Sequence, residues 1–138
     1  MITEPITRLI TRYPALAPLE GALTAAGERL LACFRAGGKL LLCGNGGSAA
    51  DCLHIAGELL KGFTSTRPLA EEDRAALAAL YGDEGTRLGR RLQRGLPAVA
   101  LPGALALTTA MANDVDADLV YAQGVMALGV PEIGRAHV

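Results

Sequence analysis

The sequence predicts an α/β fold, a Rossmann-like parallel sheet flanked by helices. The apolar residues 40–43 are typical of a buried strand, and a glycine-rich turn and a helical pattern follow them directly. A second short apolar segment, residues 97–101, comes after a helical stretch. Strands that alternate with helices favour a parallel sheet. Because two strands are too few for a finished sheet, we expect this fold to be incomplete at the C-terminus.

Apolar spacing predicts two helices before the first strand. Residues 2–13 form a short amphipathic segment that Pro14 ends, and residues 18–36 carry apolar side chains at intervals of three and four. The glycine pair after residue 36 ends this second helix. The first strand covers about residues 39–43. Its helix runs from about residue 48 to 62, with Ser48 as the expected N-cap.

The rest of the chain is predicted to be mainly helical. One helix begins at Pro68 and ends near Tyr81, where Gly82 closes it, and residues 83–94 form another that Gly95 stops. The second strand covers residues 97–101. Two further helices, residues 105–112 and 118–128, are separated by a loop at residues 113–116.

Composition limits the class of protein. A chain of 138 residues that is 51% hydrophobic can form one globular domain with a sizeable core. A formal net charge of -1 and an aromatic content of 4% give no support to a nucleic-acid binder. The apolar stretches are too short or too broken by glycine to cross a bilayer. Three cysteines in apolar contexts, and a start that does not resemble a signal peptide, predict reduced thiols and a cytoplasmic location.

Residues 132–138 look artificial. The sequence Glu-Ile-Gly-Arg-Ala-His-Val has no periodicity and matches the conceptual translation of a common sequencing adapter. We therefore expect residues 1–131 to be natural sequence, residues 132–138 to be a non-native tail, and the parent protein to be longer. His54 is then the only natural histidine of the chain.

The most informative motif is the turn after the first strand, with the sequence Gly44-Asn45-Gly46-Gly47-Ser48. A glycine turn between a strand and a helix directs backbone N–H groups and the positive end of the helix dipole at one point, where a phosphate or another anion binds. The turn formally matches a dinucleotide motif, but the next strand does not end in the expected acidic residue, and no P-loop lysine follows. The alternative is a tight turn that needs glycine only for its backbone.

The helix after this turn carries His54 and Glu58 four residues apart, and therefore on one face. A carboxylate there can act as a base, and the two side chains can be metal ligands. The alternative is a solvated polar face that also includes Asp51 and Lys61. The arginines of the predicted 83–94 helix also have two interpretations. They either contact a sugar phosphate or a neighbouring subunit, or they form a solvated face.

The residues 43–48 and 53–59, Cys-Gly-Asn-Gly-Gly-Ser and Leu-His-Ile-Ala-Gly-Glu-Leu, resemble the sugar isomerase (SIS) domain of phosphoheptose isomerases. The second strand, the Ala112-Asn113-Asp114 segment, and residues 118–121 and 127–129 continue this resemblance, which spans nearly all of residues 18–131. It implies a homotetramer that converts sedoheptulose 7-phosphate to a heptose 7-phosphate through an enediol, with sites at subunit interfaces.

The resemblance also implies roles for individual residues. The substrate site would be lined by Asn45, Gly46, Gly47, Ser48, Glu58, Asn113 and Asp114. Glu58 would be the catalytic carboxylate, and His54 and Glu58 would ligate zinc. Taken alone, Asn113 and Asp114 are equally consistent with a simple turn.

Two features depart from the family pattern. The serine-rich phosphate loop and the later glutamine and histidine of the family are not in this chain, so we expect the chain alone to be inactive. The segment of residues 66–95 is longer than the matching segment of the shortest relatives, and we interpret it as a helical insertion.

Two other functions remain possible for this sequence. One is a non-catalytic adaptor that binds a replication initiator, although the known adaptors of this kind lack the helix glutamate. The other is a sugar-phosphate sensor attached to a DNA-binding module.

Overall fold

The computed structural model describes residues 3–130, so the predicted non-native tail lies outside the described residues. The described residues divide into two compact units, residues 3–40 with 129–130, and residues 41–128. Within residues 3–130, no helix is both long and apolar enough to cross a membrane.

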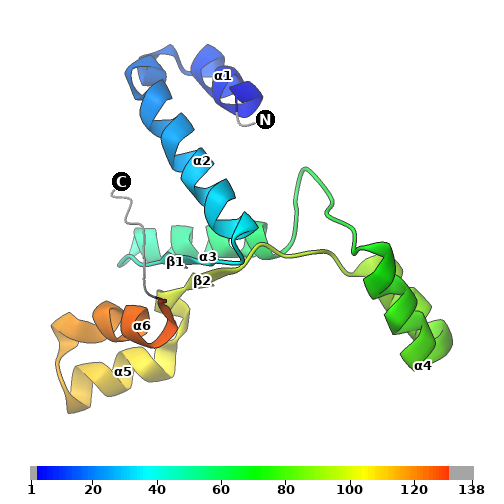
Figure 1. Cartoon of the computed structure of the whole chain (residues 1–138). Helices are drawn as coiled ribbons and strands as arrows, with labels where there is room; N and C mark the ends of the chain where they lie inside the picture. Colours follow the sequence, from blue (N-terminus) through cyan, green and yellow to red (C-terminus); the bar gives the residue numbers. More distant parts are fainter. Residues whose placement is uncertain (1–2, 131–138) are drawn as a thin grey trace. The chain divides into compact units, whose positions relative to one another are not determined.

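The first unit contains helix α1 (Thr3–Arg12), the 3₁₀ helix η1 (Pro14–Leu19) and helix α2 (Glu20–Arg35) (Figure 1). The side chain of Ile6 is buried, and α1 packs against both η1 and α2. The helix predicted from residue 18 begins two residues later, and the 3₁₀ turn before it was not predicted. Pro18 lies inside that turn and has no N–H group to donate, which explains the irregular start.

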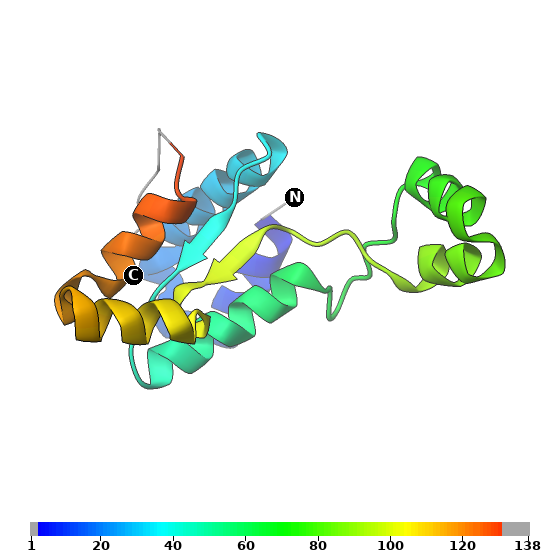
Figure 2. The same cartoon turned by 90° about the horizontal axis from the view of Figure 1, so that it is seen from below.

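The second unit is built on two short strands. Strands β1 (Leu40–Leu42, of which the last two residues belong here) and β2 (Ala98–Ala100) form a two-stranded sheet, and they run parallel (Figure 2). Helix α3 (Gly47–Leu60) packs against β2 and the following 3₁₀ helix η2 (Leu101–Gly103). The predicted α/β class with a parallel sheet is confirmed.

The end of the second unit is a pair of helices that pack on each other, α5 (Leu105–Asp114) and α6 (Val120–Leu128). The 3₁₀ helix η3 (Ala117–Leu119) connects them, and the carboxylate of Asp116 caps it by accepting a hydrogen bond from the Asp118 N–H group at 2.9 Å. Helix α5 therefore includes two residues that the sequence predicted to lie in a loop, Asn113 and Asp114.

The predicted insertion is a helical hairpin, α4 (Glu71–Arg91), at the end of two extended segments (Figure 2). The predicted break at Gly82 is confirmed, because this residue has φ +59° and ψ -130°, a conformation that favours glycine. The predicted start at Pro68 was wrong. Pro68 forms an antiparallel bridge with Gln93, and the helix begins three residues later.

Close packing of backbone holds the two halves of this hairpin together. Gly85 and Gly89 are buried, and a Cβ atom placed on Gly85 would lie 1.8 Å from the carbonyl oxygen of Leu77. A Cβ atom on Gly89 would lie 3.3 Å from Arg74. The hairpin halves can therefore approach as they do only with glycine at residue 85.

The core of the second unit is small, and its buried apolar side chains are Cys52, Ala56, Ala98 and Leu101. Several large apolar side chains are exposed, among them Leu105, Met126 and Phe63, which is 78% exposed. Of the three cysteines, Cys52 is buried and Cys33 is partly buried, while Cys43, which follows the last residue of β1, is exposed.

We predict that Gly85→Ala opens the α4 hairpin. The added methyl group meets backbone that cannot move independently, so the free energy of unfolding should fall by about 1–3 kcal/mol, as for other overpacked sites. Thermal unfolding followed by circular dichroism measures this loss. Gly21→Ala in α2 is the matched control, because nothing lies within 4 Å of its added Cβ atom. An equal melting temperature for Gly85→Ala and the wild type would contradict the packing argument.

Candidate functional site

The glycine-rich turn of residues 44–48 joins β1 to α3, as the sequence predicts. Gly46 has φ +56° and ψ -124°, which an L-amino acid with a side chain rarely adopts. A Cβ atom on Gly44 would lie 2.7 Å from the Cβ atom of Ser48. The two glycines are therefore required by backbone conformation and by close contact, respectively.

The cap of α3 differs from the prediction. The N-cap residue is Gly46, with no side-chain hydrogen bond, and Ser48 lies inside the first helical turn. The Ser48 N–H group donates to the carbonyl oxygen of Asn45 at 3.1 Å, so the turn folds back on itself before the helix begins. Within the described residues, the N–H groups of Gly46 and Gly47 donate to no protein acceptor. These two groups are free to bind an anion at the positive end of the helix.

Tyr121 is a contact to this turn that sequence reasoning missed. It comes from α6, 77 residues from Gly44, and its hydroxyl group donates to the Gly44 carbonyl oxygen at 2.6 Å. The same hydroxyl oxygen lies 2.7 Å from the side-chain amide of Asn45. The only sequence signal was the place of Tyr121 in the family-like segment, which indicates no contact partner.

The structure brings His54 and Glu58 together on α3. The distance between His54 Nε2 and Glu58 Oε1 is 3.8 Å, and the two side chains are 78% and 41% exposed. A ligand or an ion from solution can therefore reach both. The same exposure fits the alternative of a solvated polar face.

Asn113 and Asp114 lie in the last turn of α5 and are exposed. The sequence predicted them in a loop, but the α5 pattern continues for two more residues, until Val115 leaves the helical conformation with φ -130° and ψ -80°. Among the described residues, neither side chain forms a hydrogen bond or ion pair with the glycine-rich turn or with α3.

The predicted arginine cluster is partly paired and belongs to the surface of the hairpin. Arg87 forms an ion pair with Glu84, and its Nε donates to Glu84 Oε2 at 2.7 Å. This hydrogen bond lowers the pKa of Glu84 and raises that of Arg87. Both groups are exposed, so the pair contributes little to stability. Arg94 is not in the helix, which ends at Arg91.

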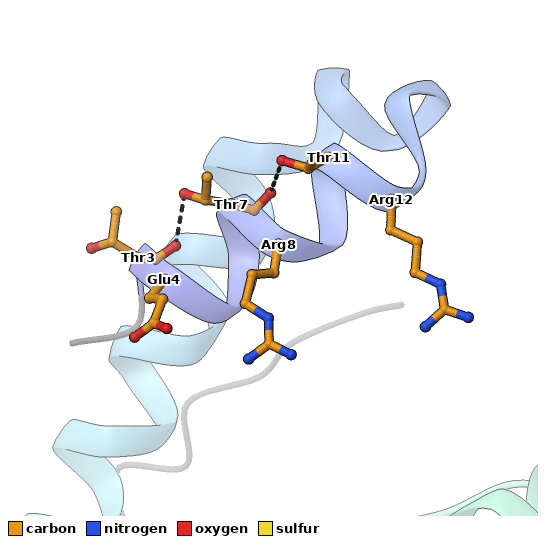
Figure 3. A pocket seen from close by; sticks show the side chains of 6 residues that line it. All are labelled: Thr3, Glu4, Thr7, Arg8, Thr11 and Arg12. Atoms are coloured by element: carbon orange, nitrogen blue, oxygen red, sulfur yellow. Dashed lines mark hydrogen bonds between the residues drawn. The ribbon is translucent and has the colours of Figure 1, made fainter.

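A hollow of about 700 Å³ in the first unit is not a good candidate for the substrate site. All of its lining residues belong to α1, at spacings that put them on one helix face: Thr3, Glu4, Thr7, Arg8, Thr11 and Arg12 (Figure 3). The Thr7 and Thr11 hydroxyl groups donate to carbonyl oxygens one turn earlier, at 2.9 and 2.7 Å. A single helix face lacks polar groups that converge from several elements, which binding sites for small molecules require.

Curated relatives share the name phosphoheptose isomerase. The protein from Roseiflexus sp. (strain RS-1) is 40% identical over 109 residues, which are 79% of this chain and 42% of the relative. The one from Shewanella piezotolerans is 33% identical over 121 residues, 88% of this chain and 48% of the relative. The one from Trichlorobacter lovleyi is 36% identical over 117 residues, which are 82% of this chain and 46% of the relative. The chain spans about half the length of these relatives, or slightly less.

The profile of the SIS domain matches residues 5–94. This match takes in α1, α2, the glycine-rich turn, α3 and the α4 hairpin, which is well over half of the chain. The chain therefore belongs to the SIS domain family.

Proposed function

We propose that the protein to which this chain belongs is a phosphosugar isomerase, and that it converts sedoheptulose 7-phosphate to a heptose 7-phosphate through an enediol. The observation that carries the proposal is the arrangement on α3. Free N–H groups of Gly46 and Gly47 lie at its start, and the exposed carboxylate of Glu58 lies three turns later on the same helix. The relatives named phosphoheptose isomerase support this choice of reaction.

Glu58 is the proposed base. In the isomerisation of a ketose, a carboxylate takes a proton from C1 while the C2 carbonyl oxygen gains a proton, which gives the enediol. The carboxylate then returns its proton to C2 while the C1 hydroxyl group loses its own proton, which gives the aldose. The side chain of Glu58 is exposed enough for this contact, at 41%. The adaptor relatives considered above lack this carboxylate, which favours the catalytic alternative.

Asn45 is the proposed acceptor for a sugar hydroxyl group. The hydroxyl group of Tyr121 has a single proton and can donate one hydrogen bond. Because the Gly44 carbonyl oxygen can only accept, we assign this proton to Gly44. The Asn45 amide is satisfied when its NH₂ group faces the tyrosine oxygen, an orientation that differs from the assigned one only by an amide flip. The amide oxygen of Asn45 then faces away from Tyr121 and is available to the substrate. The side chains of Ser48, Asn113 and Asp114 are also proposed to line the substrate site.

His54 and Glu58 are the proposed zinc ligands. The nitrogen and oxygen donors, 3.8 Å apart on one exposed face, fit two positions of a tetrahedral site. Residues 3–130 contain no group of three or more His, Cys, Asp or Glu side chains that fits a metal ion, so further ligands would come from elsewhere. When bound, zinc would polarise the substrate carbonyl group.

We also propose a cytoplasmic homotetramer that binds neither nucleic acid nor membrane. The exposed apolar side chains of Leu105, Met126 and Phe63 support association, because monomers rarely leave large apolar surface uncovered. Unpaired thiols at Cys33, Cys43 and Cys52 support a reducing compartment. The 138-residue chain alone is expected to be inactive.

We predict that Glu58→Gln, in the full-length product of the gene, lowers turnover of sedoheptulose 7-phosphate by at least about 10²-fold, because an amide cannot accept the proton. A coupled assay of the aldose product measures turnover, and circular dichroism checks the fold. Glu84→Gln, an exposed carboxylate on the hairpin, is the matched control and should stay active. Near-normal turnover of Glu58→Gln would remove Glu58 from the mechanism and favour an adaptor or sensor.

We predict that His54→Ala loses zinc from the same full-length protein, because one of two ligands on α3 is gone. Elemental analysis after purification without chelators measures the zinc content. Asp51→Asn, one turn earlier on the polar face, should keep its zinc. Equal zinc in His54→Ala and the wild type would make His54 part of a solvated face only.

We predict that Tyr121→Phe weakens substrate binding. Loss of the hydroxyl group frees the Asn45 side chain and leaves the Gly44 carbonyl oxygen without its partner, at a cost of about 1 kcal/mol in stability. KM for the sugar phosphate should rise several-fold with little change in kcat. Tyr81→Phe on the hairpin, where the tyrosine is 61% exposed, is the control. An unchanged KM would show that Tyr121 does not orient the turn.

A further inference from the structure

The last turn of α3 carries carbonyl oxygens that no later helical turn can satisfy. Helix α3 ends at Leu60, and Arg67 covers this end with its guanidinium group. Its Nη2 donates to the carbonyl oxygens of Leu59, at 2.5 Å, and of Glu58, at 3.3 Å. A cation at this position also complements the negative end of the helix dipole.

Arg67 is itself held in place by the other extended segment of the hairpin base. Its Nε donates to the Arg94 carbonyl oxygen at 2.9 Å, and the Arg94 N–H group donates back to the Arg67 carbonyl oxygen at 2.7 Å. The side-chain oxygen of Gln93 accepts from the N–H groups of Gly62, at 3.1 Å, and of Arg67, at 3.4 Å. We call residues 62–68 and 93–96, which these bonds join, the neck.

The neck also contacts α3 directly. The Leu96 N–H group donates to the Leu59 carbonyl oxygen at 2.8 Å, so this oxygen accepts from both segments of the neck. A Cβ atom on Gly95 would lie 2.9 Å from the Leu60 carbonyl oxygen. The backbone around Glu58 is therefore fixed at its C-terminal side by the base of the α4 hairpin.

We propose that Arg67 is a positioning residue for Glu58, an inference that rests on the proposed isomerase function. The carboxylate of Glu58 is exposed, and among the described residues its one hydrogen-bond or ion-pair partner is His54, at 3.8 Å. Its position thus depends on its backbone, and Arg67 holds that backbone through the carbonyl oxygen of Glu58 itself. A base displaced by about 1 Å can lose on the order of 10²-fold in rate, so this contact sets the rate of proton transfer.

The test compares Arg67→Met, Arg67→Lys and the wild type in the full-length product of the gene. Arg67→Met keeps an unbranched apolar stem and removes the charge and the donors of the guanidinium group. We expect its kcat to fall by about 10- to 100-fold with KM within about 3-fold. Arg67→Lys keeps a cation that can reach one carbonyl oxygen and should recover most of kcat. Arg91→Met, an exposed arginine at the end of α4, is the matched control and should match the wild type.

Two further measurements complete the test: the first separates a loss of kcat from a loss of stability, and the second follows the backbone around Glu58. Gly85→Ala, which is expected to destabilise the hairpin without touching α3, should keep kcat when assayed below its melting temperature. Hydrogen exchange of a peptide that spans residues 54–62 should be faster in Arg67→Met and unchanged in Arg91→Met. A lower melting temperature of Arg67→Met with wild-type kcat would overturn the proposal and leave Arg67 a structural cap.

The outcome also distinguishes this inference from the proposed function. If the wild type does not isomerise sedoheptulose 7-phosphate, the proposed function fails for this substrate. Hydrogen exchange then still tests whether Arg67 holds the backbone at Glu58, because this hold predicts faster exchange at residues 58–60 in Arg67→Met. Unchanged exchange in that peptide overturns the positioning role whether or not the protein is active.

Discussion

The packing of α3 against β2 is the contact on which the arrangement of the second unit depends. Cys52 and Ala56, on the inner side of α3, are buried together with Ala98 of β2 and Leu101 of η2. Three of these four side chains are small, which lets the helix lie close to the strand. One helix then presents the free N–H groups of the turn, the pair of His54 and Glu58, and the C-terminal end that Arg67 covers. A shift in the packing of α3 on β2 would therefore move the N–H groups, the His54–Glu58 pair and the C-terminal end of the helix together.

The parts of this fold that depend on near neighbours in the chain could be predicted from the sequence. The strand, the glycine-rich turn and α3 follow from an apolar run, a turn that only glycine allows, and a 3.6-residue period. The break at Gly82 follows for the same reason, since a positive φ after a helical pattern is favourable for glycine. The closeness of His54 and Glu58 follows from helical geometry alone.

The errors occur where a contact from elsewhere in the chain overrides a local preference. Pro68 is a good first residue for a helix, but its bridge with Gln93 keeps it extended. One error is local instead: Ser48 is a good N-cap, but the turn closes two residues earlier, at Gly46. The hydrogen bond from Tyr121 to Gly44 joins residues 77 positions apart, and no pattern in a single sequence indicates such a pair. The parts of the candidate site outside the glycine-rich turn and α3 were therefore predicted only by family resemblance.

The neck explains how this fold carries a long helical hairpin between its strands without losing the contacts of α3. The two segments that lead into and out of α4 are bonded to each other at Pro68–Gln93 and Arg67–Arg94. An insertion whose ends are fixed side by side closes on itself, and further length in such a loop costs little free energy. The guanidinium group of Arg67, within the same neck, donates to the carbonyl oxygens of Glu58 and Leu59. The contacts that make the insertion tolerable therefore also connect it to the residue proposed to do the chemistry.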